Sequence, residues 1–156
     1  MRRMLALALV TLAAAACGGT AGGSSMLGGF AGYKWSVVAI GHDGKETPVP
    51  ARYNVYLQFA PNGQYGANDP VNSHGGTYRV TSAGFATSDV ATTLVGYVGK
   101  DPVTLLAVAA ISSFDDGSSA AVRNLGPGMI VIDVNGYALR CRRAGEQANF
   151  PSAAHT

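Results

Sequence analysis

The two short apolar segments on either side of Asn135-Gly136 constrain the fold more than any other part of this sequence. Asn-Gly is typical of a two-residue type I′ turn, because both positions of that turn need a positive φ angle. Such a turn fixes the register of residues 129–134 against residues 137–142. It pairs Val134 with Tyr137, Ile132 with Leu139 and Ile130 with Cys141. All of these side chains then share one face, which predicts an antiparallel hairpin with that face in a hydrophobic core.

The other face of the hairpin carries Asp133, Arg140 and Arg142 and is expected to meet solvent. Cys141 is therefore predicted to point inward as a small, unreactive apolar side chain. The alternative is a reactive thiol or an intermolecular disulfide.

Further strands are predicted upstream of the hairpin. Residues 53–59 alternate strictly, with Tyr53, Val55, Leu57 and Phe59 on one face. Residues 33–40 predict a strand that buries Trp35, Val37 and Ala39. Short strands are also expected from Gln64 onward and at 77–81 and 85–88, with a polar loop over 68–76.

One helix is predicted. Asp101 is a favourable N-cap residue, and Pro102 suits the first helical position. Leu105, Val108, Ala109 and Ser112 follow at helical spacing, and we expect the helix to end near Phe114.

The N-terminus predicts export and lipid attachment. Arg2 and Arg3 precede an apolar run over residues 4–16, and small residues then surround Cys17. This layout resembles the bacterial lipobox, in which the cysteine receives a diacylglyceryl group and becomes the first residue of the mature protein. A membrane-spanning anchor is the alternative, but it needs about 20 apolar residues; an ordinary secretory signal would not need the cysteine.

The division of the chain follows from this leader. Residues 1–16 are expected to be a lipoprotein signal peptide, 17–31 the lipidated cysteine and a flexible Gly/Ser tether, 32–143 one domain and 144–156 a disordered tail. The leader holds two of the 11 Lys and Arg residues, so the remainder is balanced against nine Asp and Glu residues. This neutral balance argues against nucleic acid as a partner.

The order of the motifs resembles the META domain (HslJ-like) family of bacterial envelope proteins. The resemblance covers residues 32–143 and rests on the Trp35 strand, the Phe59 to Gly63 turn, Asn68, the Gly76-Thr77-Tyr78 strand and the Thr-rich segment at 92–96. It implies an α+β fold with a curved antiparallel β-sheet, a partial barrel, and one main packed α-helix. It also implies an envelope location and links to stress and antibiotic tolerance, without a defined reaction. Many members have cysteines where this chain has Ala67 and Tyr97, so no role of that cysteine pair carries over.

Three kinds of chemistry were weighed against the sequence. His42-Asp43 and Asp69 with His74 are possible metal ligands, but Asp is common in such Gly-rich turns for backbone reasons, and we expect no metal. No Gly-x-Ser-x-Gly elbow marks a serine hydrolase, and Asp115-Asp116-Gly117 lacks the further ligands of a calcium loop. We therefore predict no catalytic residues and no cofactor.

A contact surface is the more credible prediction. Tyr56 is expected on the polar face of its strand, Tyr65 and Tyr97 lie near loops, and these three with Asn68 form the candidate surface. The sequence thus predicts a monomeric, lipid-anchored protein on the extracytoplasmic face of a bacterial membrane, with a noncatalytic role in binding an envelope component or in stress tolerance. The alternatives are a carrier of a small apolar ligand and, less favoured, an enzyme with an unfamiliar site.

Overall fold

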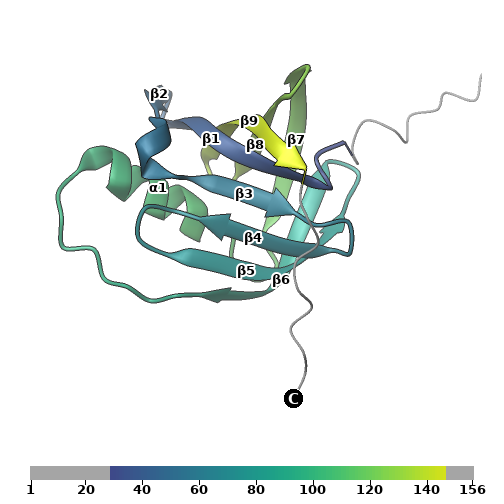
Figure 1. Ribbon diagram of the computed structural model, residues 1–156, viewed down its shortest axis with the longest axis horizontal. Coiled ribbons are helices and arrows are strands. Elements are labelled where there is room, and N and C mark those ends of the chain that lie inside the picture. The colour runs from purple at the N-terminus through teal and green to yellow at the C-terminus, as the bar shows by residue number, and fades with distance from the viewer. Residues whose placement is uncertain (1–28, 147–156) are drawn as a thin grey trace, which may run out of the picture.

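The computed structural model describes residues 29–146 as a β-rich domain with one α-helix (Figure 1). The elements in chain order are β1 (Tyr33–His42), β2 (Lys45–Pro48), a short 3-10 helix (Ala51–Tyr53), β3 (Tyr56–Phe59), β4 (Gln64–Asn68), β5 (Ser73–Val80), β6 (Gly84–Thr92), α1 (Pro102–Ser112), β7 (Ser119–Gly126), β8 (Met129–Val134) and β9 (Tyr137–Glu146).

The sheet closes on itself. Neighbouring strands follow the order β2-β1-β3-β4-β5-β6-β7-β8-β9, and β1 pairs in addition with β9 from Tyr33 to His42. Eight antiparallel strands, β1 and β3 to β9, thus form a barrel, and β2 adds to the second half of β1. The prediction of a curved antiparallel sheet with a helix is confirmed, but the barrel is closed and not partial. Closure joins the first and last strands, and no local sequence signal encodes such a distant pairing.

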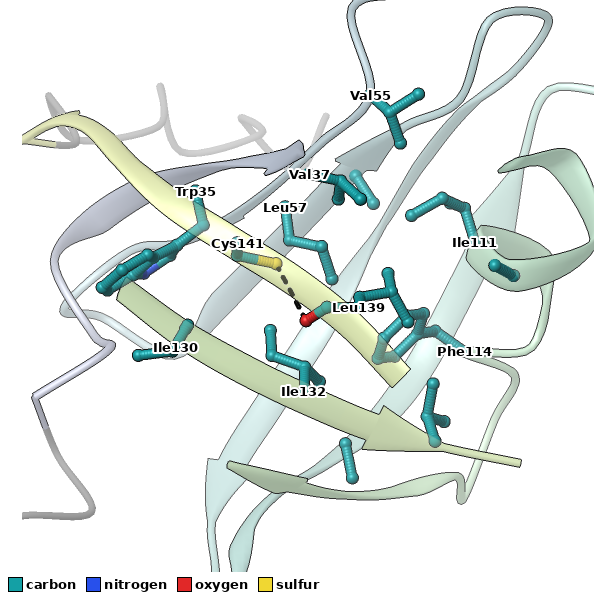
Figure 2. Packing of buried hydrophobic residues seen from close by; sticks show 14 of the residues in the cluster. Trp35, Val37, Val55, Leu57, Ile111, Phe114, Ile130, Ile132, Leu139 and Cys141 are labelled. Atoms are coloured by element: carbon teal, nitrogen blue, oxygen red, sulfur yellow. Dashed lines mark hydrogen bonds between the residues drawn. The ribbon is translucent and has the colours of Figure 1, made fainter. Parts of the chain in front are cut away.

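The predicted hairpin is confirmed. Strands β8 and β9 pair Val134 with Tyr137, Ile132 with Leu139 and Ile130 with Cys141. Asn135 and Gly136 both have positive φ angles, 43° and 84°, as a type I′ turn requires. Cys141 is fully buried, and its Sγ lies 3.5 Å from the carbonyl oxygen of Leu139 (Figure 2). Burial raises the pKa of the Cys141 thiol, so it stays protonated and inert.

Aromatic rings fill the interior of the barrel. The Phe59 ring lies 4.9 Å from Phe30 and 4.7 Å from Phe85, and Phe114 stacks on Phe85 at 6.0 Å. Tyr65 lies against both Phe59 and Phe114. Aliphatic side chains from β1, β3, β8 and β9 belong to the same core, and Figure 2 shows Val37, Leu57, Ile132 and Leu139 among them.

The helix begins as predicted but buries a different face. The Asp101 carboxylate accepts hydrogen bonds from the N–H and hydroxyl of Thr104 at 2.9 and 2.7 Å. The buried helical residues are Thr104, Ala107, Ala110 and Ile111, whereas Leu105, Ala109 and Ser112 are exposed. The small alanines let the helix approach the end of the barrel closely. Across the part of the chain that the structure describes, no helix combines the length and apolar character needed to cross a membrane.

Several strands begin at residues other than those predicted. The 3-10 helix delays the start of β3 from Tyr53 to Tyr56. Residues 73–76, predicted as part of a polar loop, belong to β5, and β7 had no prediction at all.

The described domain extends slightly beyond the expected span of 32–143. Phe30 is 1% exposed and packs in the core, and β9 continues to Glu146, into the segment expected as a disordered tail. The predicted signal peptide, Cys17 and the tether up to residue 28 lie outside the described residues, as do residues 147–156.

Candidate functional site

The polar residues singled out in the sequence gather at one end of the barrel, which we call the helix end. It consists of α1, the last residues of β1, β4, β6 and β8 and the first residues of β3, β5, β7 and β9, with their connections. The described chain starts and finishes at the opposite end, beside the first residues of β1 and the last of β9 (Figure 1). Any segment that leads into β1 is therefore attached on the far side from the helix end.

A buried hydrogen-bonded cluster joins three strands at the helix end. His74 Nε2 lies 2.9 Å from Asp69 Oδ2, and His74 Nδ1 lies 2.9 Å from the Thr92 hydroxyl. The side chains of Asp69 and His74 are 0% and 2% exposed. Asp69 Oδ1 accepts the N–H groups of Val71 and Asn72 at 2.7 and 2.8 Å, which shapes the turn between β4 and β5.

Opposing effects set the ionisation of Asp69. Burial raises its pKa, but the hydrogen bonds from His74, Asn72 and Val71 and the charge of His74 outweigh burial and hold the pKa below its ordinary value. An ionised carboxylate can only accept, so Nε2 of His74 donates to Asp69, and Nδ1 shares the second hydrogen bond with the Thr92 hydroxyl.

Thr92, His74 and Asp69 have the hydrogen-bond order of a nucleophile, a base and an orienting carboxylate. Two features argue against that use. Asp69 and His74 are closed off from solvent, and the N–H that follows the hydroxyl, on Thr93, is bonded to Ser73 O at 3.0 Å and so is not free to stabilise an oxyanion. The cluster is better explained as a lock between β4, β5 and β6.

The lock extends into the long connection between β6 and α1. Asn72 uses its side-chain amide as a strand would use its backbone: Oδ1 accepts the N–H of Val95 at 2.8 Å, and Nδ2 donates to the Val95 carbonyl at 3.4 Å. The Thr93 hydroxyl in turn accepts the N–H of Ser73 at 3.0 Å. The first residues of the connection are thus held beside β5.

Beyond this lock the connection presents apolar side chains to solvent. Leu94 is 94% exposed and Val98 99%, with Val95 at 58% and Tyr97 at 37%. Leu105 on the adjoining helix is 48% exposed. We call residues 93–98 the apolar segment. A run of exposed large apolar residues of this kind marks an interaction site more often than scattered single ones do.

The four predicted contact residues do not form one surface. The prediction that Tyr65 belongs to a contact surface is wrong, because this residue is 2% exposed. It faces the interior beside Phe59, its partner across the β3–β4 pair. Tyr56 and Asn68 are direct partners in that same pair. The ring of Tyr56 is covered by Lys34, whose Nζ lies 3.6 Å from the ring centre.

The side-chain amide of Asn68 makes hydrogen bonds within the domain at both of its polar atoms. Its Nδ2 donates to the carbonyl oxygens of Asn54 and Asp69, and its Oδ1 accepts the Ser73 hydroxyl. Of the predicted set, Tyr97 alone belongs to the apolar segment. The sequence reasoning missed Leu94 and Val98, since apolar residues in a Thr-rich run look like a buried strand.

The two histidine pairs considered as metal ligands lie apart in the barrel. His42 Nε2 is 3.4 Å from Asp43, and its ring stacks on Tyr137 at 4.3 Å beside a shallow hollow of about 550 Å³ between the β1–β2 and β8–β9 turns. His74 pairs with Asp69 as described. Within residues 29–146 no three His, Cys, Asp or Glu side chains are placed to hold a metal ion together.

Comparison with known proteins bears on the fold alone. No protein-family model matches the chain, and no curated protein does. The chain is similar to the NMR structure of a protein from Burkholderia xenovorans, with a TM-score of 0.56 and 15% identity over 74% of this chain and 83% of that one. A likeness at this identity supports the β-barrel architecture.

Proposed function

We propose that this protein is a lipid-anchored, noncatalytic component of the bacterial envelope, whose barrel presents its helix end to another envelope component. The observation that carries the proposal is the apolar segment, held beside β5 by the Asn72 amide while Leu94 and Val98 stay almost fully exposed. Such exposure lowers solubility unless a partner covers it.

The position of this segment fits a tethered protein. If Cys17 carries the lipid, the barrel is anchored through the chain that leads into β1, at the end opposite to the helix end. The apolar segment would then face away from the anchoring membrane, toward other envelope components. This arrangement agrees with the envelope role that the META resemblance implies.

The two alternative functions have less support. A carrier of a small apolar ligand needs an internal cavity, and the middle of this barrel is occupied by packed rings. An enzyme needs polar groups that converge on a cleft, whereas Asp69 and His74 are buried and their cluster with Thr92 serves the local structure.

The anchor can be tested by labelling. Cells that express the full chain are grown with radioactive palmitate, and we expect label in the wild type and none in Cys17→Ser. An unlabelled wild type, or one that keeps its leader, would refute the lipid anchor.

The binding role can be tested separately. Detergent-solubilised envelope is passed over immobilised wild type, Val98→Glu and the matched control Leu125→Glu, which changes a half-exposed leucine in β7 near the opposite end. We expect a bound component that the first variant loses and the control keeps. Equal recovery by all three proteins would rule out the apolar segment as the binding surface.

A further inference from the structure

The apolar segment has the properties of an unpaired strand edge. None of its residues has a positive φ angle, and it leaves the end of β6 as an open stretch of chain (Figure 1). Thr93 and Val95 direct main-chain groups toward Ser73 and Asn72. In extended chain, successive residues direct these groups to opposite sides. No hydrogen bond joins the main chain of Leu94, Gly96 or Val98 to any other described residue, so these main-chain groups are free to pair.

Strand β2, at the margin of the sheet, is protected against further pairing, and the apolar segment is not. Strand β2 lies at the margin of the sheet and carries Lys45, Glu46 and Pro48, the residue types that normally block pairing with another chain. Residues 90–99 contain no charge and no proline. An apolar strand edge without either device is suited to accept a further strand.

We infer that the strand which pairs with the apolar segment is the same segment of a second copy of this chain, in antiparallel register about Gly96. This inference rests on the proposed function and names the envelope component that the helix end binds. In that register Leu94 of each copy lies opposite Val98 of the other, and Val95 lies opposite Tyr97. Every pair is apolar, and no like charges meet.

The hydrogen-bond directions agree with this register. With Gly96 opposite Gly96, the unpaired main-chain groups of Leu94, Gly96 and Val98 would take the positions that exchange both N–H···O bonds in an antiparallel pair. Gly96 has no neighbour within 4 Å of where a Cβ would stand, so a second strand can approach it. The two-fold symmetry makes the contact self-limiting, as in other isologous dimers.

A contact of one short strand pair is small, so the dimer is weak in dilute solution. Attachment of both copies to one membrane would raise their effective concentration and favour pairing there. The inference departs from the monomer expected from the sequence.

The test is disulfide trapping in membranes that contain the full chain. The Cα atoms of a hydrogen-bonded antiparallel pair lie about 5.5 Å apart, within the range that a disulfide spans. We expect mild oxidation of Gly96→Cys to give a covalent homodimer beyond the wild-type background. The matched control Ser82→Cys places an exposed cysteine in the turn before β6, at the opposite end, and should give none.

Charged substitutions distinguish specific pairing of the two segments from disulfides that form by random encounter. In the Gly96→Cys background, Leu94→Lys and Val98→Glu should each abolish the dimer, and the double variant should restore it, because each new lysine then faces a glutamate of the other copy. Both positions are almost fully exposed, so the changes leave the fold intact.

Each other outcome has a fixed meaning. A homodimer yield equal to that of Ser82→Cys, or a double variant that fails to recover, overturns the self-pairing. Trapping of a different protein by Gly96→Cys overturns it as well but leaves the proposed binding role standing. Absence of any trapped product, together with envelope binding that ignores Val98→Glu, removes both.

Discussion

Truncation of Ile132 to alanine tests the barrel core most directly. Ile132 lies in the middle of β8, opposite Leu139, and is 0% exposed (Figure 2). The change removes three buried carbon atoms, worth about 0.8 kcal/mol each, or roughly 2.4 kcal/mol in transfer free energy. A closed barrel packed with rings cannot collapse easily into the space, so a cavity cost adds to this. We expect a loss of about 3 to 4 kcal/mol in the free energy of unfolding, within the range of about 2 to 5 seen for such truncations.

Denaturant unfolding followed by tryptophan fluorescence provides the assay. The chain has one tryptophan, Trp35, which is 3% exposed and reports on the same core. Ile132→Val should cost only about 0.5 to 1.5 kcal/mol, and Leu94→Ala, on an almost fully exposed side chain, should stay within about 0.5 kcal/mol of the wild type. If Ile132→Ala cost no more than Leu94→Ala, the register of the β8–β9 hairpin would be refuted.

Three shorter predictions concern buried polar groups. The Tyr65 hydroxyl is buried with no hydrogen-bond partner among the described residues, so Tyr65→Phe should keep or raise stability by about 1 kcal/mol in the same unfolding assay; a clear loss would reveal a partner. The pKa of Asp69 is lower in the folded chain than in the unfolded one, so its stabilising effect is complete above the unfolded pKa of about 4 and is lost as the pH falls from there through the lower folded pKa. Asp69→Asn should therefore flatten the acid limb of a stability-against-pH curve, and an unchanged limb would count against the cluster. Cys141 should resist thiol reagents in the native protein and react on unfolding, and rapid native labelling would contradict its burial.

The elements that the sequence predicted well are those with local signals. The Asn135-Gly136 turn determines its own hairpin, and Asp101 with Pro102 determines the start of α1. In both cases a few neighbouring residues satisfy their own backbone requirements, whatever surrounds them.

Features that depend on distant pairing could not be predicted in this way. Gly75 and Gly76 look like loop residues, yet they lie in β5 at a bulge where a Cβ on Gly76 would come within 2.8 Å of the Ser88 carbonyl. Strand β7 has no alternation of its own and forms because β6 and β8 pair with it.

The same reason applies to the candidate site. Asp69 and His74 could be noted as neighbours in the sequence, but their bond to Thr92 depends on the register of β5 against β6, which pairs His74 with Thr92. Leu94 and Val98 are apolar, so the sequence alone predicts that they are buried, whereas the structure exposes them. This exposure becomes visible only in the structure, where the apolar segment lies outside the closed barrel.

The pairing of β1 with β9 affects how the chain folds as it is made. Strand β1 is made more than 90 residues before β9, so a nascent chain that lacks β9 cannot close the barrel. Until β9 has been made, the edge of β1 that pairs with it has no partner strand. Closure of the barrel is therefore expected to be a late and slow step of folding, because it joins two segments that lie far apart in the sequence.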